Sequence, residues 1–194
     1  MSPADTPGGL FNSGHDIPSG PGLTPRGYLK IDNPTHPPIR KCTNMKSLWH
    51  ETVRDEMLAR IARLTPETRP VWGRMSCSEM LAHVLAGMRM GSGELPTRLR
   101  KTFLRWWPLN ELLVRFVPFP RGAKAPREIV VTTGSDVDWT ATVGALNASI
   151  HSFETRDAKT FAWPVHPVFG KISAGAWGRL AYKHMDHHLR QFGV

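Results

Sequence analysis

The C-terminal stretch, residues 173–194, places histidines on the apolar face of an uninterrupted helix. Ser173 is a good N-cap residue, no proline follows it, and Gly193 stands where a glycine commonly ends a helix. At about 100° per residue, His184 and His188 lie one turn apart within the same third of the circumference. The other residues on this face are Trp177, Leu180, Ala181 and Gln191. The stretch therefore predicts a helix that turns two imidazoles toward the core.

Two imidazoles in an apolar stripe need polar partners, because an unpaired buried polar group costs free energy. A divalent metal ion shared by both rings would meet this need if a third ligand came from elsewhere in the chain. His187 lies about 60° from His184 on the flank of the stripe, and we predict that it is not a ligand. The alternative is a pair of core histidines that form hydrogen bonds with neighbours such as Glu79, Asn147 or Gln191.

Residues 1–44 differ in composition from the rest of the chain. Fourteen of them are proline or glycine, and their apolar residues follow no period. Such a segment buries too little surface to offset the entropy lost on ordering, so we predict a disordered tail over 1–44 and a folded domain over 45–194. Met45 is a candidate natural start. The tail lacks a signal-peptide pattern, no run reaches about 18 apolar residues, and two cysteines imply no disulfide framework, so we expect a cytoplasmic protein.

Four segments with helical periodicity follow, near residues 46–64, 76–90, 136–155 and 174–192. The second begins with a capping box from Ser76 to Glu79 and is apolar on nearly all sides, so it should lie in the centre of the fold. The third carries apolar residues at intervals of three and four, at Trp139, Val143, Leu146, Ile150 and Phe153. Four such helices joined by loops predict an all-α four-helix bundle.

A basic, aromatic insertion separates the second and third long helices. Residues 95–127 contain eight Lys or Arg against one acidic residue, Glu111, and so supply +7 of the net charge of +9. Prolines divide the insertion, leaving two short helices near 97–106 and 109–117, and residues 129–133 read as extended linker. The insertion could bind nucleic acid, lie on an anionic membrane, or fold over the bundle with its aromatic residues in the core. We favour the third arrangement, because prolines interrupt any long amphipathic face and no nucleic-acid motif is present.

The third metal ligand is predicted on the second helix. His83 is the only histidine in that helix, and a central helix can face the pair on the last one. The predicted site is therefore His83, His184 and His188. Three neutral imidazoles leave an open position for water or substrate, which is the pattern of a catalytic site. Ligand softness alone permits Zn, Ni, Fe or Cu, and among these we expect Zn or Ni, with Fe as an alternative.

Other residues receive supporting roles. Glu79 and Gln191 are candidates to orient the metal-binding histidines from outside the ligand set. His166 lies in a proline-flanked loop just before the last helix and is a candidate acid, base or substrate contact. Tyr182 and Asp186 fall on the outer face of the last helix, so we assign them no catalytic role.

The motifs around these histidines resemble those of the DinB/YfiT-like superfamily of metal-binding four-helix bundles. The string from His184 to Gln191 is similar to the HxxHHxxQ string of that superfamily, whose members also carry a histidine on the second helix. The chain resembles more closely an uncharacterised bacterial family within it, with a Trp-Gly-x-Met motif at residues 72–75, an HPxFG loop at 166–170 and a YKHxDHHxRQFG string at 182–193. This resemblance implies a DinB-like four-helix bundle with metal ligands His83, His184 and His188.

The resemblance implies less about the reaction. Some members of the superfamily are thiol S-transferases or isomerases that use a low-molecular-weight thiol, and others look hydrolytic. We therefore expect a metal-dependent transferase or hydrolase acting on a small molecule, with such a thiol as a candidate cosubstrate. The alternative is a non-catalytic bundle, a metal-holding stress protein or interaction module in which the histidines are structural. A homodimer is expected, and neither nucleic-acid binding nor a membrane span is.

Overall fold

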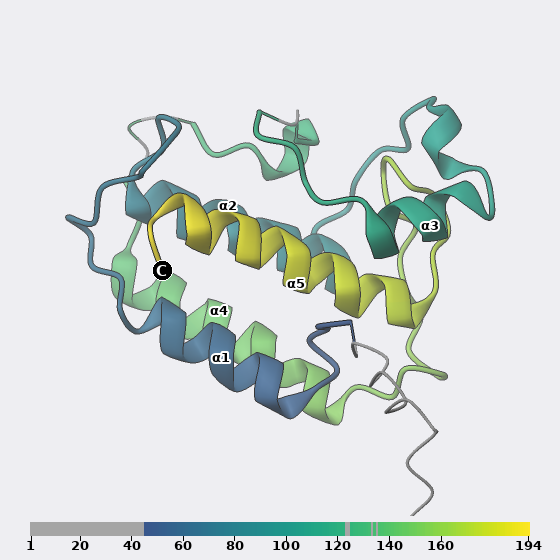
Figure 1. Ribbon diagram of the computed structural model, residues 1–194, viewed down its shortest axis with the longest axis horizontal. Coiled ribbons are helices and arrows are strands. Elements are labelled where there is room, and N and C mark those ends of the chain that lie inside the picture. Colours follow the sequence, from purple (N-terminus) through teal and green to yellow (C-terminus); the bar gives the residue numbers. More distant parts are fainter. Residues whose placement is uncertain (1–44, 123–124, 133, 135) are drawn as a thin grey trace, which may run out of the picture. The chain divides into compact units, whose positions relative to one another are not determined.

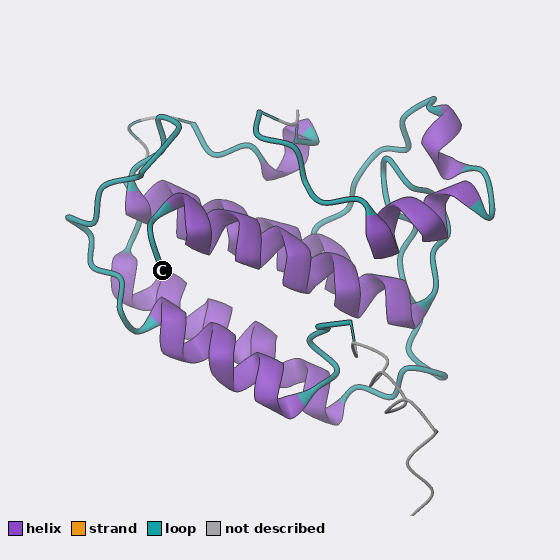
Figure 2. Ribbon diagram, in the orientation of Figure 1, coloured by secondary structure: helices purple, strands orange, loops and turns teal. Residues whose placement is uncertain are grey.

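The computed structural model describes residues 45–194 apart from 123–124, 133 and 135. The predicted disordered tail over 1–44 lies outside the described residues. The described part contains helices and loops but no strand (Figure 2). Its α-helices are α1 (Glu51–Ile61), α2 (Cys77–Ser92), α3 (Leu109–Phe116), α4 (Trp139–Thr155) and α5 (Ala174–Gln191). Two short 3-10 helices, η1 (Phe103–Arg105) and η2 (Arg127–Ile129), lie on either side of α3 in the sequence.

The four long helices pack as the predicted all-α bundle. Helix α2 packs against α4 and α5, and α1 packs against the same two helices, so the four enclose one core (Figure 1). Its fully buried side chains come from every helix and from the turn before α1: Leu48, Met57, Met80, Leu81, Leu146, Ile150, Met185 and Leu189. No helix of the described residues is long and apolar enough to cross a membrane.

The predicted ranges of three of the four long helices agree with the structure to within three residues at each end, the largest difference being α4, which begins at Trp139 rather than at residue 136. Ser76 and Glu79 form the capping box of α2, and the Ser173 side chain accepts a hydrogen bond from the backbone of Ala176 at the start of α5. Asp138 caps α4 in the same way. Gly193 follows α5 with φ +77°, a conformation that glycine adopts without strain. Local side chain–backbone hydrogen bonds therefore cap the starts of these three helices.

Helix α1 is shorter than the predicted 46–64. Residues 47–50 form a turn that is bound to α5 by one backbone and one side-chain hydrogen bond. The Leu48 N–H donates to the Gly178 carbonyl at 3.2 Å, and the Trp49 indole donates to the Ala174 carbonyl at 2.9 Å. The same packing corrects the outer-face placement of Tyr182, which is 6% exposed and belongs to the core. Helix α1 packs against the side of α5 that carries Tyr182. This side of α5, opposite the histidines, is therefore also buried.

The insertion differs from its prediction in two respects. Its second short helix is α3, but the first, expected over 97–106, is reduced to η1 because the preceding backbone binds other loops: the Arg100 N–H donates to the Pro167 carbonyl at 2.9 Å. The predicted packing of its aromatic residues into the core is wrong for four of them. Their side chains are 66–80% exposed: Phe103, Trp106, Trp107 and Phe116. Helix η1 buries none of its residues, and α3 buries only Asn110 and Val114.

Hydrogen bonds fasten α3 to the bundle. The Lys183 ammonium, on α5, donates to the Val114 carbonyl at 2.8 Å and also to the Leu113 and Val117 carbonyls, so it caps the C-terminal end of α3. The buried Asn110 amide donates to the Phe169 and Lys171 carbonyls at 3.0 and 2.9 Å. The helix of the insertion is therefore held against α5 and against the loop before α5.

Candidate metal centre

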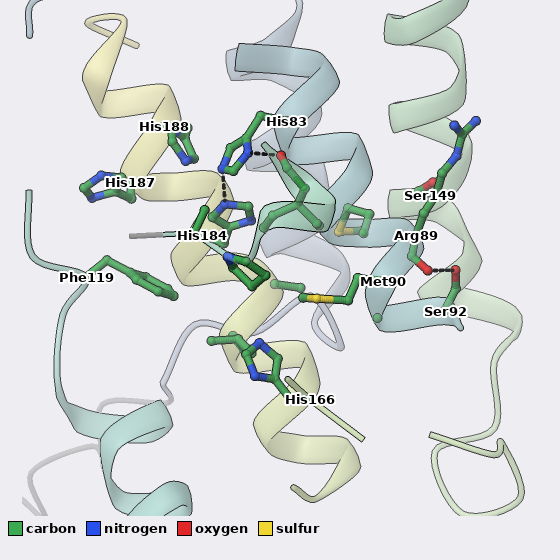
Figure 3. Close-up of a pocket in the computed structure, with 18 of the residues that line it drawn as sticks. His83, Arg89, Met90, Ser92, Phe119, Ser149, His166, His184, His187 and His188 are labelled. Atoms are coloured by element: carbon green, nitrogen blue, oxygen red, sulfur yellow. Dashed lines mark hydrogen bonds between the residues drawn. The ribbon is translucent and has the colours of Figure 1, made fainter. Parts of the chain in front are cut away.

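Three histidines from two helices meet in one cluster. His83 comes from the middle of α2, and His184 and His188 come from successive turns of α5. One ring nitrogen from each lies within 4.8 Å of the others, and the Nε2 atoms of His83 and His184 are 3.0 Å apart. Figure 3 shows the three rings turned toward one another. The structure thus brings together the three residues that the helical spacing predicted, in an arrangement that could hold a metal ion.

Two of the three rings are oriented by an acceptor on their far side. His83 Nδ1 is 2.6 Å from the Ile129 carbonyl oxygen, which can only accept, so Nδ1 carries the proton. His188 Nδ1 is 2.9 Å from Gln191 Oε1, and the amide of Gln191 is itself oriented because its Nε2 donates to the Trp72 carbonyl. In both rings Nε2 therefore keeps its lone pair, which is the form that binds a metal. His184, whose Nε2 faces that of His83, then donates in their hydrogen bond when no metal is present.

The supporting residues differ partly from the prediction. Gln191 contacts His188, whereas the Glu79 carboxylate accepts from the backbone N–H groups of Ser76 and Gly134. The expected contact of Glu79 with His83 is corrected: the acceptor is the Ile129 carbonyl, at the end of η2. Sequence reasoning missed this residue because a backbone carbonyl leaves no trace in the sequence.

The rings are neutral near neutral pH. Burial lowers the pKa of His83, and the hydrogen bond to Ile129 opposes this only in part. Burial, reinforced by the nearby His83, lowers the pKa of His188 to about 4. Burial also lowers the pKa of His184 well below its ordinary value, and the surrounding imidazoles add to the effect. All three pKa shifts favour the uncharged form that can act as a ligand.

The spacing fits a tetrahedral ion. Nitrogen ligands at about 2.0–2.1 Å from such an ion stand about 3.4 Å from one another. The Nε2 atoms of His83 and His184 are 3.0 Å apart, and all three ligand nitrogens lie within 4.8 Å of one another, so small ring movements would bring them to this spacing. No carboxylate or thiol joins the group within the described residues. Three imidazoles would fill three of the four positions of a tetrahedral ion. One coordination position would remain for a molecule from the adjoining cavity.

The cluster forms part of the wall of a large cavity. The cavity has a volume of about 750 Å³ and lies among α2, α4, α5 and the loops beside them. Most of its lining is apolar or aromatic, including Met88, Met90, Phe153, Trp163, Trp177 and Leu180. His187, predicted not to be a ligand, lines the same cavity and packs its ring against Trp72 and Phe119. A mainly apolar cavity of this size suits a small organic molecule.

His166 lines the same cavity but is separate from the three-histidine cluster (Figure 3). It is buried against the rings of Trp177 and Phe169. Its Nδ1 accepts the backbone N–H groups of Val168 and Phe169, both at 3.1 Å, so the proton of the neutral ring lies on Nε2. Burial lowers the pKa of His166 to about 4. Near neutral pH this ring can donate a hydrogen bond through Nε2 but is poorly suited to take up a proton.

The lowered pKa of His166 predicts a loss of stability in acid. Below pH 6.5 an unfolded histidine binds a proton that the folded His166 does not bind until about pH 4, so the free energy of unfolding falls as the pH falls between these values. Between pH 7 and pH 5 we expect this residue to account for about 2 kcal/mol of the fall. In His166→Asn, whose amide oxygen can still accept the two backbone N–H groups, the fall should be smaller by that amount.

Urea unfolding of metal-free protein at a series of pH values measures this difference. The cluster histidines titrate in both proteins, so their contribution cancels in the comparison. Equal pH dependence in the two proteins would show that the folded state protonates His166 freely.

Comparison with known proteins gives one match. Residues 43–193 match the model of a family described as "Protein of unknown function (DUF1569)". No curated protein and no solved structure gives a significant match.

Proposed function

Since the chain belongs to the DUF1569 family, whose description assigns no function, we propose its function from the site: a metal-dependent enzyme that acts on a small, largely apolar molecule. The observation that carries the proposal is the convergence of His83, His184 and His188 at the wall of the 750 Å³ cavity. A purely structural metal site is usually closed by four protein ligands, whereas this cluster offers three beside an open volume.

Different residues of the site would bind the metal, orient its ligands and hold the substrate. A divalent metal held by three imidazoles would supply a Lewis acid that lowers the pKa of a water or thiol in its open position. Ile129 and Gln191 accept from Nδ1 of His83 and His188, which leaves the Nε2 lone pairs of both rings available to hold such an ion. The apolar walls of the cavity exclude water and take up the body of the substrate. The Nε2–H of His166 contacts a substrate acceptor and helps to orient it, in keeping with a proton that stays on the ring at neutral pH.

We also propose that this family is a branch of the DinB/YfiT-like superfamily, with a thiol S-transferase or hydrolase-like reaction. The support is the four-helix bundle with one histidine on its second long helix and the HxxxH pair on its last. A reacting thiol would come from a cosubstrate. Cys77, the only cysteine in the described part of the chain, is fully buried, and burial raises the pKa of its thiol to about 11.

Metal content tests the proposal directly. We expect protein purified without a metal-affinity tag to carry close to one divalent ion per chain by mass spectrometry, and His184→Ala to carry less than a tenth of that. His187→Ala is the matched control, because this neighbouring imidazole lies outside the ligand set, and it should retain the ion. Wild-type protein that holds no metal, and takes up none on titration with Zn²⁺ or Ni²⁺, would contradict the proposal. With the ion established, thiols and electrophiles can be screened for turnover.

One observation favours a second candidate, a non-catalytic bundle. His83 and His184 form a direct hydrogen bond of 3.0 Å, and His188 is hydrogen-bonded to Gln191, so each ring already has one hydrogen-bond partner without an ion. In this candidate the metal, if bound, only stabilises the fold. Removing it should then lower the melting temperature strongly, and no thiol should perturb the spectrum of a Co²⁺-substituted site. An enzyme should keep its fold without metal and bind thiols at the ion.

A further inference from the structure

An exposed aromatic and basic surface covers the insertion, and neither the metal centre nor the cavity uses it. We define it as residues 98–117. Phe103, Trp106, Trp107 and Phe116 are 68%, 72%, 80% and 66% exposed. Such side chains are ordinarily buried, and several of them exposed on two elements in contact, η1 and α3 with the turn between them, mark a surface that meets something other than water.

The exposed side chains sit on a fixed support. Helix α3 turns Val114 and Asn110 inward, and its other side presents Leu109, Leu112 and Phe116 to the outside. Lys183 and Asn110 bind this helix to the bundle through the hydrogen bonds described above. The exposed side chains of α3 are therefore presented in a defined arrangement, and η1, which carries Phe103, packs against α3.

Positive charge accompanies the apolar groups. Arg98, Lys101 and Arg105 are exposed within the same stretch, and in the part of the chain that the structure describes Lys101 and Arg105 form no ion pair. The one acidic residue of the insertion, Glu111, is already occupied by Arg115 and by the N-cap Ser173. The surface thus combines exposed apolar side chains with cations, Lys101 and Arg105, that have no ion-pair partner among the described residues. A complementary partner should combine an apolar interior with negative charge.

We propose that residues 98–117 dock the protein on the surface of an anionic lipid bilayer. Aromatic and aliphatic side chains enter the interface between headgroups and acyl chains, while Lys and Arg contact the anionic headgroups. A second copy of the chain fits less well, because residues 98–117 carry five Lys or Arg and one Glu, so two such surfaces would bring a net charge of +4 against +4. Single-stranded nucleic acid would use the aromatic rings and cations but not the exposed aliphatic residues Leu99, Leu112 and Val117, which have no part in base stacking.

Co-sedimentation of the full chain with vesicles tests the proposal. We expect binding to vesicles of phosphatidylcholine with 30% phosphatidylglycerol to be at least tenfold stronger than to phosphatidylcholine alone, and to weaken in 0.5 M NaCl because salt screens the headgroup charge. Phe103→Ser with Trp106→Ser should weaken it at least tenfold, and so should Lys101→Glu with Arg105→Glu. Val71→Ser removes a side chain that is 71% exposed outside this surface, and it should bind as the wild type does.

Circular dichroism of each variant confirms that its fold is intact, which is expected because every changed side chain is exposed. Equal binding to both kinds of vesicle, or none to either, would overturn the proposal. So would unchanged binding in the double variants. Tight binding of a single-stranded oligonucleotide that depends on Trp106, without vesicle binding, would assign the surface to nucleic acid instead. A dimer in light scattering that the Phe103 and Trp106 changes dissolve, again without vesicle binding, would assign it to self-association.

Discussion

Replacing Gly87 with alanine should weaken metal binding ten- to a hundredfold while leaving the metal-free fold intact. A Cβ atom at this position of α2 would lie 2.8 Å from both Cε1 and Nδ1 of the His184 ring, closer than real Cβ contacts allow. The ring would have to move away from the position in which its Nε2 stands 3.0 Å from that of His83. Displacements of this order cost affinity because the ligands no longer share one centre.

Competition with a chromophoric chelator measures the affinity of Gly87→Ala, and urea unfolding of the metal-free protein measures its stability. Alanine is a better helix former than glycine by about 1 kcal/mol, which offsets part of the strain from moving one ring. Gly144→Ala is the matched control: a Cβ added to this α4 glycine would meet no atom within 4 Å, so the change should stabilise the fold and leave metal affinity unaltered. Wild-type affinity in Gly87→Ala would mean that His184 is not a ligand or that its ring has room to adjust.

Gly178→Ala should lower the free energy of unfolding by about 2–3 kcal/mol, although helix propensity alone predicts a gain. This glycine of α5 lies where the turn before α1 crosses the helix. An added Cβ would stand 2.6 Å from Ser47 Oγ and closer still to the Trp49 ring. Trp49 cannot withdraw easily, because its indole donates to Ala174 and its ring packs edge-on against Phe153 and Trp163, at 5.0 and 5.8 Å between ring centres.

Calorimetry of Gly178→Ala should show a melting temperature lower by roughly 5–10 °C, as expected for a loss of this size in a domain of about 150 residues. Gly144→Ala again supplies the comparison, with a change of opposite sign. A melting temperature equal to that of the wild type would show that the turn carrying Trp49 can move off α5 at little cost. Metal affinity should change little, since Gly178 faces the turn before α1 and the ligand histidines lie further along α5.

The bundle and its histidine cluster were predictable because both depend on short-range patterns. The i,i+4 spacing of His184 and His188 places two rings on one helix face whatever the rest of the chain does. The caps Ser76, Asp138 and Ser173 act within three residues of themselves, so their effect can be read locally. His83 could be added because a central, apolar helix has to face the others.

What the sequence did not reveal depends on contacts between distant segments. The Ile129 carbonyl reaches His83 across 46 positions, and any residue type could supply it. Helical periodicity assigns Tyr182 to an outer face, because it cannot show that α1 covers that side of α5. The exposure of Trp106 and Trp107 runs against their hydrophobicity, and such a departure is expected where a surface serves binding rather than folding.

The way the insertion is attached has a consequence for engineering chimeras of this protein. Lys183, which holds the end of α3, is the immediate neighbour of His184 on α5, and Phe119 lies against the His184 ring with 6.0 Å between ring centres. The chain then continues to Ile129, whose carbonyl orients His83. The insertion is therefore not a detachable module. Trimming it to a short linker, or exchanging it for a homologous segment of different length, should disturb two ligands at once, so a transplanted insertion has to bring its own contacts to α2 and α5.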